Sequence, residues 1–379
     1  MVDCHGIVAR IPNRMIRSNH RVKAPSHMIV RAALGLHRLL ERLARRVLTP
    51  EALVFTEVVR LARSEVLGAL VALGVMDELR RPTTAAEIAG RLGLDADRLF
   101  RVLRAATQMG LVTLDRRGRF TATRIGRVLR SDHPSQSREL VRYFTSRGNR
   151  DAWSFLTHTL RTGENGFGKA HGTDVWTWFA EHPEERETFG RALMGLELGD
   201  APFVASLFPW AEVAVICDVG GGCGVLLSEI LLRNPRVAGV LVDAPAVLAS
   251  AGQLLARCDV IDRVTLAPGS FFERVPPGHD AYLMKHILHD WDDTTCTRIL
   301  GVVRQAMAPG AKALLVERLL DRHDTTSFAV LTDLQMMVAC ADGRERSRED
   351  FATLLRNSGF RPGRVFAGPT IAVIEGVAI

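Results

Sequence analysis

The sequence predicts an α/β protein in which a doubly wound sheet is preceded by a smaller, mostly helical winged-helix module. From about residue 211 onward, apolar runs typical of buried strands alternate with helical patterns. One of these runs leads into a glycine-rich turn, DVGGGCG at 218–224, and an acidic residue, Asp243, follows 19 positions after Gly224. Further upstream, two short helical patterns precede a hairpin signal.

Length and composition are those of a globular protein with two or three domains. The chain has 379 residues, of which 47% are hydrophobic and 24% charged. No apolar run approaches the roughly 20 residues that span a bilayer, and the first residues contain no signal-peptide core. The cysteines show neither a CxxC pair nor metal-site spacing, so we expect a cytoplasmic protein without a disulfide framework. They are Cys4, Cys217, Cys223, Cys258, Cys296 and Cys340.

Positive charge is concentrated in the first 150 residues, which contain 28 basic and 13 acidic side chains. Such an imbalance can indicate a nucleic-acid partner. However, only four of the 49 basic residues are lysines, so arginine is the default cation of this chain rather than a recognition device. We therefore expect a solvated or interface surface and no nucleic-acid partner.

Residues 1–48 are interpreted as an N-terminal extension. Residues 1 to about 27 show no periodicity and are predicted to be disordered. Residues 29–48 have apolar side chains at helical spacing with arginines on the opposite face. Such a helix can lie on a membrane, but burial in a dimer or against its own domain is favoured, and we expect no membrane partner. A start assigned too far upstream, with much of this segment untranslated, is a third interpretation.

Residues 49–140 are expected to contain short helices and a small β element, which together make the winged-helix module. Thr84 and Glu87 form a capping box for a helix that ends at Gly93. Asp95 caps the next helix, 96–109, and a hairpin spans 111–122. This second helix could enter a DNA groove. Its basic residues are Arg98, Arg101 and Arg104. They alternate with apolar residues, so they fit the solvent-exposed face of a helix that packs on the core equally well.

Residues 141–210 are predicted to be linking helices whose aromatic side chains could wall a flat substrate. Residues 211–379 are predicted to be the ligand-binding domain. Its strands are expected at 213–217, 237–242, 264–268, 280–285 and 312–317, and its helices at 225–232, 246–257, 296–307 and 348–358, before terminal strands.

The glycine turn is suited to a nucleoside. Glycines permit positive φ and let the backbone touch a ligand, and an acidic residue about 20 positions later can accept ribose hydroxyls. A tight strand–helix corner is the alternative. Dinucleotide sites usually show G-x-G-x-x-G, whereas here Asp218 precedes the glycines. An acid would repel a pyrophosphate but would suit an ammonium group, which favours S-adenosylmethionine over NAD.

Ligands of doubly wound sheets bind at the carboxyl ends of the strands, so the residues after each strand are the candidates. His289 is the best general base, since an imidazole with a pKa near 6.5 can accept a phenolic proton. Glu317 could hold the imidazole in the required tautomer. Their alternatives are a helix cap for His289 and a surface side chain for Glu317. Asp292 and Asp293 are interpreted as helix caps rather than metal ligands.

Several blocks together resemble the plant caffeic-acid type of S-adenosylmethionine-dependent O-methyltransferases, a family with bacterial members that tailor polyketides and other aromatic metabolites. The blocks are DVGGGCG, LVDAP, GSFF, LMKHILHDWDD, LLVERL and GRERSREDF. The similarity runs from about Val54 to the C-terminus. It implies a Rossmann-like methyltransferase domain, a winged-helix dimerisation domain, a homodimer and a small aromatic acceptor.

The resemblance also implies roles for individual residues. The catalytic set would be His289 with Glu317 and Glu345 beside it, and no metal is expected. The residues implied to bind the cofactor are Asp218, Gly220, Gly222, Asp243, Gly269, Ser270, Phe271 and Lys285. The residues implied to line the acceptor pocket are Trp153, Phe167, Met194, Asp333, Met336 and Met337. Ser270 departs from the family, which often has an acid there, so weaker cofactor affinity is an expectation.

Three alternatives remain beside O-methylation. The same fold could perform hydroxylation or decarboxylation, although the presence of His289 and Glu317 favours methyl transfer. The cleft could instead present a nitrogen or carbon nucleophile. The winged-helix module could also make the chain a regulator.

Overall fold

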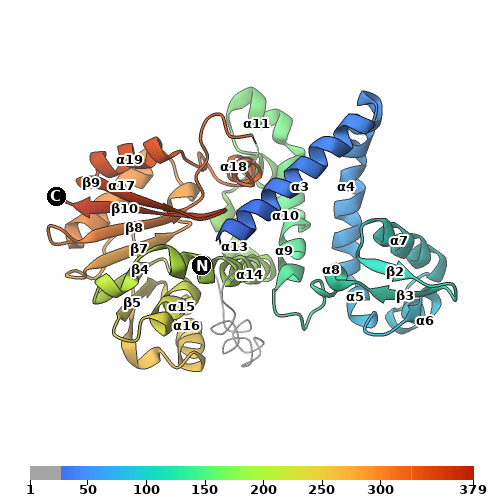
Figure 1. Ribbon diagram of the computed structural model, residues 1–379, viewed down its shortest axis with the longest axis horizontal. Coiled ribbons are helices and arrows are strands. Elements are labelled where there is room, and N and C mark those ends of the chain that lie inside the picture. Colours follow the sequence, from blue (N-terminus) through green and yellow to red (C-terminus); the bar gives the residue numbers. More distant parts are fainter. Residues whose placement is uncertain (1–26, 326) are drawn as a thin grey trace. The chain divides into compact units, whose positions relative to one another are not determined.

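The computed structural model describes residues 27–325 and 327–379, which form two compact units (Figure 1). The N-terminal unit contains residues 27–146 and 191–195, and the C-terminal unit contains 147–190 and 196–379. The predicted disorder of residues 1 to about 27 falls on residues outside the described ranges, except for residue 27, which begins a helix.

The N-terminal unit has the predicted order of a winged-helix module. The capping box at Thr84 is present: its hydroxyl accepts from the Glu87 amide at 3.3 Å, and its own amide donates to the Glu87 carboxylate at 2.7 Å. Its three short strands form a sheet in the order β1-β3-β2. Its elements are α3 (His27–Val47), α4 (Pro50–Ala72), α5 (Val75–Glu78), β1 (Thr83–Thr84), α6 (Ala85–Leu92), α7 (Ala96–Gln108), β2 (Val112–Leu114), β3 (Arg119–Ala122), α8 (Arg124–Arg127) and α9 (Ser137–Phe144).

Short helices follow residue 49 as predicted, but the first helix of this region, α4, is 23 residues long, which the sequence pattern did not indicate. Thr49 caps it by accepting the Ala52 amide at 3.3 Å, and Pro50 occupies the first turn, where it has no hydrogen bond to lose. Apolar side chains lie on several faces of this helix, so no single stripe marks its length in the sequence.

The C-terminal unit begins with linking helices, as predicted, and continues as a doubly wound sheet. The helices and 3-10 turns before the sheet are α10 (Arg147–Ser154), α11 (Leu156–Thr162), α12 (Gly166–His171), α13 (Val175–Glu181), α14 (Pro183–Leu207) and η1 (Trp210–Glu212). The helices and 3-10 turns that connect the strands of the sheet are α15 (Val225–Arg233), α16 (Pro245–Arg257), η2 (Ile261–Arg263), η3 (Leu288–Asp290), α17 (Asp293–Ala306), α18 (Ala329–Ala339) and α19 (Arg348–Asn357).

Seven strands form this sheet in the order β6-β5-β4-β7-β8-β10-β9. The first five are parallel, and β10 runs antiparallel to both β8 and β9. Figure 1 shows α15 and α16 on one face, and α17 and α19 on the other. The strands are β4 (Val215–Val219), β5 (Ala238–Asp243), β6 (Val264–Pro268), β7 (Ala281–Lys285), β8 (Lys312–Glu317), β9 (Phe360–Ala367) and β10 (Ala372–Ala378).

The parallel order brings the carboxyl ends of β4, β5, β6, β7 and β8 to one edge of the sheet. β4 extends two residues further than predicted, so Asp218 lies within the strand instead of after it. Every candidate after a strand therefore lies at this edge, and apolar side chains on the strands below, such as Tyr282, Leu315 and Val240, form the core that supports it.

The cysteines correct one expectation. Cys217, Cys258, Cys296 and Cys340 are buried and free, as predicted. Cys223, in the glycine turn, takes part in a disulfide bond, which the expectation of a chain without a disulfide framework did not include. Among the described residues, no helix has both the length and the apolar character needed to cross a membrane.

Candidate active site

The glycine turn after β4 has open space on one side and packed side chains on the other. Gly220 and Gly222 have φ values of 68° and 58°, which side chains rarely adopt. The Gly220 amide donates to the Val242 carbonyl at 2.8 Å, which ties the turn to β5. A Cβ at Gly221 would lie 2.5 Å from both the Asp218 carboxyl and the Leu241 side chain, whereas a Cβ at Gly222 would meet open space. Backbone at Gly222 is therefore accessible to a ligand.

Asp243 lies at the end of β5 and faces this turn. Its Oδ2 accepts the Gly222 amide at 2.9 Å, and its Oδ1 accepts the Ala244 amide at 2.7 Å. Burial raises the pKa of this carboxyl, and the two amide hydrogen bonds partly offset that effect. Each carboxylate oxygen accepts more than one hydrogen bond, so Asp243 can still receive the hydroxyls of a ribose.

Residues after β6 cover the same turn. The Phe271 ring lies 3.3 Å from the position of a Cβ on Gly220, next to the Ile287 side chain. The Gly269 amide donates to the Asp243 carbonyl at 3.1 Å, and the Ser270 hydroxyl accepts the Phe272 amide at 3.2 Å. The structure thus brings the predicted glycines, Asp243 and Phe271 together.

Asp218 lies below the glycine turn, and its contact with the ammonium group of the cofactor stays a prediction. The side chain is 2% exposed and lies beneath Gly221. Burial, together with Glu197 and Asp243, raises the pKa of Asp218 well above its ordinary value. The carboxyl fills the space under Gly221, so it supports the glycine turn by packing.

Glu197, on α14, is an acid that sequence reasoning missed. Burial raises its pKa, while the Lys285 ammonium and a hydrogen bond from the Leu226 amide act in the opposite direction. Leu226 is in the first turn of α15, directly after the glycine turn. Glu197 and Lys285 therefore add a carboxylate and a cation to this edge of the sheet. Nothing in the local pattern of α14 distinguished Glu197 from its acidic neighbours.

Replacing Gly221 with alanine is expected to weaken cofactor binding about tenfold or more, because the new methyl group would displace the turn or the Asp218 carboxyl beneath it. Isothermal titration with S-adenosylmethionine measures the change. Gly301→Ala is the matched control, because a Cβ there meets nothing within 4 Å. Wild-type affinity in Gly221→Ala would contradict the packing argument.

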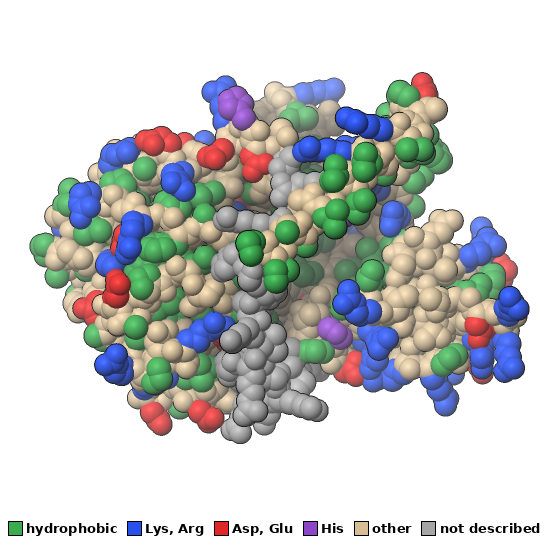
Figure 2. All heavy atoms as spheres, in the orientation of Figure 1, with side chains coloured by type: hydrophobic (Ala, Val, Ile, Leu, Met, Phe, Trp, Pro, Cys, Tyr) green, Lys and Arg blue, Asp and Glu red, His purple; other side chains and the backbone are tan. Residues whose placement is uncertain are grey.

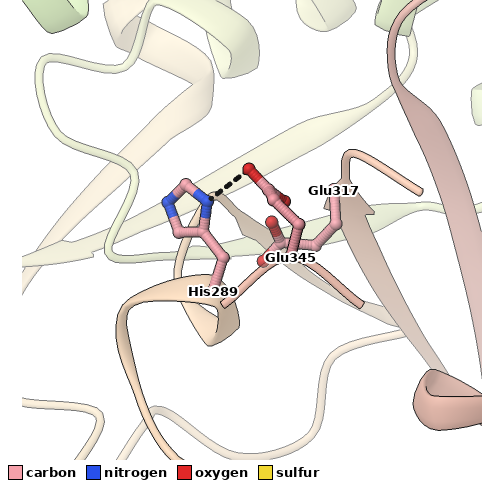
Figure 3. Close-up of side chains that lie close together, drawn as sticks. All are labelled: His289, Glu317 and Glu345. Carbon is pink, nitrogen blue, oxygen red and sulfur yellow. Dashed lines mark hydrogen bonds and ion pairs between the residues drawn. The ribbon is translucent and has the colours of Figure 1, made fainter. Parts of the chain in front are cut away.

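His289 and two buried glutamates form a compact cluster at the ends of β7 and β8 (Figure 3). The His289 Nδ1 lies 3.4 Å from Glu345 Oε1, and Nε2 lies 3.5 Å from Asp290 Oδ1. The ligand atoms of His289, Glu317 and Glu345 all lie within 4.8 Å of one another, a spacing that would also suit a cation. Glu317 is fully buried and Glu345 is 6% exposed.

The charges of this cluster correct the expected pKa of His289. Burial opposes the imidazolium, but Asp290, Glu317 and Glu345 outweigh it and raise the pKa of His289 to about 9. Burial likewise raises the pKa of Glu317 to about 7 and that of Asp290 to about 6. The negative charge around His289 therefore favours its protonated form.

Glu345, rather than Glu317, contacts the His289 ring. Glu317 Oε1 instead accepts the amides of Ile287 and Leu288, at 3.2 and 3.0 Å. The tautomer role predicted for Glu317 is thus corrected: it holds the backbone beneath His289 and adds negative charge. The Oε2 atoms of Glu317 and Glu345 are buried without a hydrogen-bond partner among the described residues.

Arg346 is a second residue that sequence reasoning missed. It is fully buried and donates to the carbonyls of Leu288 and Trp291, at 2.6 and 2.7 Å, on either side of His289. It also donates to Asp293 Oδ1 at 2.9 Å. Asp292 caps α17 as predicted, by accepting the Thr295 amide at 2.6 Å, whereas Asp293 pairs with Arg346.

Most of the expected acceptor-binding residues lie on three helices that pack together, α10, α12 and α18. Trp153 Nε1 donates to Gln335 at 2.8 Å, and Gln335 donates to Asn149 at 2.8 Å, which joins α10 to α18. Asp333, on α18, accepts the Glu345 amide at 2.9 Å, so these helices contact the cluster that contains His289. Phe167 is buried, and Met336 and Met337 are half-buried on α18. Met194 is buried within the part of α14 that groups with the N-terminal unit.

Known proteins match the chain over most of its length. A family model described as an O-methyltransferase domain matches residues 153–361, and one described as an O-methyltransferase dimerisation domain matches 58–132. The 3-amino-4-hydroxybenzoate 4-O-methyltransferase of Streptomyces cremeus is 38% identical over 79% of this chain and 80% of its own length.

Solved structures give the same result. The crystal structure of LaPhzM matches with a TM-score of 0.83 and 32% identity, covering 88% of this chain and all of the other. The O-methyltransferase NcsB1 from neocarzinostatin biosynthesis, crystallised with S-adenosylmethionine and 2-hydroxy-5-methyl naphthoic acid, matches with a TM-score of 0.73. It is 28% identical, over 84% of this chain and 96% of its own.

Proposed function

The chain belongs to the O-methyltransferase family, and from that membership we propose that it methylates a phenolic hydroxyl of an aromatic or polyketide-type small molecule, with His289 as general base. The observation that supports this most is the contact between the His289 imidazole and buried Glu345, at the sheet edge that also carries the glycine turn. The related enzymes from Streptomyces cremeus and from neocarzinostatin biosynthesis support an aromatic acceptor and a role in secondary metabolism, such as antibiotic biosynthesis.

The cofactor is S-adenosylmethionine, which supplies an electrophilic methyl group when bound. The residues present fit it, because Gly222 offers accessible backbone and Asp243 offers acceptors for ribose hydroxyls. Gly220, Phe271 and Lys285 complete the proposed site, with Gly269 and Ser270 shaping the loop after β6.

His289 would accept the phenolic proton at Nε2, while Glu345 holds Nδ1. A more basic group accepts a phenolic proton more readily, provided that its pKa stays near the operating pH and leaves enough of it unprotonated. The pKa of about 9 for His289 is close to that of a phenol, about 10. Glu345, Asp290 and Glu317 stabilise the imidazolium that results. Helices α10, α12 and α18 would orient the acceptor.

Activity is expected to increase with pH and to level off above about pH 9, because only neutral imidazole accepts a proton and the surrounding carboxylates raise the pKa of His289 to about 9. The measurement is kcat/KM, which reports groups of the free enzyme. The ionisation of His289 and that of the acceptor phenol can be distinguished by comparing two acceptors whose phenols differ in pKa. The part of the pH profile that reports His289 should stay at the same pH, whereas the part that reports the phenol should shift with its pKa. A profile that is flat from neutral pH upward would contradict the assignment.

Labelled S-adenosylmethionine tested against phenols, hydroxynaphthoates, aromatic amines and carbon nucleophiles identifies the acceptor. Transfer to phenolic oxygen supports the proposal, and transfer to amines alone, or hydroxylation or decarboxylation of the acceptor, overturns it.

Dialysis against a chelator tests the prediction that no metal is needed. A DNA gel shift tests the regulator alternative.

The chain carries a dimerisation domain at residues 58–132, and we propose a homodimer formed through the N-terminal unit. Exposed apolar side chains follow α3 (Figure 2), among them Leu36, Leu39 and Leu43. A stripe of this kind is typical of an interface. Neither a nucleic acid nor a membrane is a proposed partner, and a cytoplasmic location stays a prediction.

Leu39→Asp combined with Leu43→Asp is expected to convert the dimer to monomer, because burying two carboxylates in an apolar interface is unfavourable. Sedimentation velocity measures the mass. Leu160→Asp is the control, since Leu160 is similarly exposed but lies in the C-terminal unit. A double variant that sediments like the wild type would exclude α3 from the interface.

A further inference from the structure

His286 has a backbone conformation that is uncommon for a residue with a side chain. Its φ is 52°, in the left-handed region, directly after β7. Histidine tolerates this region better than most residues, but the conformation still costs free energy and is typical of functional sites. The His286 amide donates to the Val316 carbonyl at 3.1 Å, and the next two amides then reach Glu317. The turn at His286 therefore sets the path of the chain toward His289.

The neighbouring lysine determines the tautomer of His286. Lys285 Nζ lies 3.4 Å from His286 Nδ1. An ammonium group only donates hydrogen bonds, so Nδ1 is the acceptor and Nε2 carries the proton. Burial, and then the charges of Lys285, His289 and Arg318, lower the pKa of His286 well below its ordinary value. The ring is thus neutral at physiological pH.

The neutral ring of His286 lies flat against His289. The ring centroids are 5.1 Å apart and the planes are 17° from parallel. His289 Nδ1 lies 3.4 Å from Glu345 and Nε2 lies 3.5 Å from Asp290. Both distances are at the long end of the hydrogen-bonding range, so these contacts restrict the tilt of the ring only weakly. The stacked His286 ring limits this tilt from one face. It adds no second charge beside the imidazolium that His289 becomes.

We propose that His286 is a positioning residue, whose neutral ring, fixed by Lys285, holds the His289 imidazole in the orientation that accepts the acceptor's proton. The inference rests on the proposed function, since it assigns His286 a part in the same reaction. His286 acts through His289 and need not touch the acceptor.

The test compares two variants of His286 with one matched control. His286→Asn removes the ring, but asparagine tolerates positive φ and keeps an acceptor for Lys285. His286→Phe keeps a flat ring without nitrogens. His279→Asn is the control, because His279 and His286 each have a buried Nε2 without a hydrogen-bond partner among the described residues. The His279 ring lies against Tyr282, at the opposite end of β7.

The expected result is a decrease in kcat of about 10- to 100-fold in His286→Asn, as small misplacements of a catalytic group produce. The acceptor KM, S-adenosylmethionine affinity and melting temperature should match those of His279→Asn. His286→Phe should recover part of kcat, because it restores a ring against His289 but not the contact with Lys285. Equal kcat in the two asparagine variants would overturn the proposal, as would a loss confined to cofactor affinity or a failure of His286→Phe to rescue a correctly folded enzyme.

Nuclear magnetic resonance of ¹⁵N-histidine-labelled wild-type protein separates this proposal from the proposed function. A wild type without methyl transfer to any acceptor would contradict the function, while the tautomer is still observed directly. We expect His286 to remain neutral with its proton on Nε2 between pH 6 and 8. A proton on Nδ1, or titration of His286 near pH 6.5, would overturn the positioning role.

Discussion

His289→Gln is expected to lower kcat by about 10²- to 10⁴-fold, the range over which a positioned general base contributes. Glutamine keeps a polar side chain but cannot take up the phenolic proton. It also cannot form the charged pair with Glu345 that stabilises the imidazolium. Because Asp243 and the glycine turn are untouched, S-adenosylmethionine should bind with wild-type affinity.

The measurement is single-turnover methyl transfer at saturating cofactor, with cofactor affinity determined separately by titration. His279→Gln is the control, since His279 lies away from the carboxyl ends of the strands and should leave kcat unchanged. Near-wild-type turnover by His289→Gln would remove His289 as the base. Loss of cofactor binding would show that its main role is structural.

Arg346→Met is expected to lower the free energy of unfolding of the C-terminal unit by about 2–5 kcal/mol. Methionine fills similar space but removes the charged donor of the Leu288 and Trp291 carbonyls. The remaining donors are the weak Cys296 thiol and, for Leu288, the Trp291 amide at 3.3 Å. Because those carbonyls flank His289, the variant should also lose kcat at temperatures where it remains folded. Urea unfolding followed by tryptophan fluorescence measures the stability.

Arg344→Met is the matched control. Arg344 also pairs with Asp293, at 2.7 Å, but both side chains are about half exposed, and exposed pairs contribute little. A stability loss in Arg344→Met equal to that in Arg346→Met would attribute the effect to the shared Asp293. It would contradict the role assigned to the buried carbonyls.

Much of the sheet was predictable because each parallel strand is a short apolar run ended by turn formers. The strand at 264–268 and the strand at 312–317 have the predicted bounds. The rule that ligands bind at strand ends then selects His289 and Glu317, and the spacing after the glycine turn selects Asp243. What the sequence could not give was the direction of β10, since apolar alternation is the same in parallel and antiparallel strands.

The residues that were missed depend on contacts between distant parts of the chain. Arg346 lies 58 positions from Leu288, in a charged stretch that reads as surface. Glu197 is one of several acids on α14, and only the fold brings it near Lys285. The structure was also needed to show that Glu345 contacts the His289 ring while Glu317 accepts backbone amides, because the sequence allows either carboxylate to reach the imidazole.

The position of β10 has a consequence for biosynthesis. This strand is translated after every other strand described here, yet it lies between β8 and β9, with Ala372 opposite Glu317. During synthesis, one side of β8 therefore has no hydrogen-bonded neighbour until residues 372–378 emerge from the ribosome. Until then, Glu317 at the end of β8 is not fully shielded from water. The N-terminal unit can fold early, whereas the surroundings of the catalytic cluster are complete only after residues 372–378 have been translated.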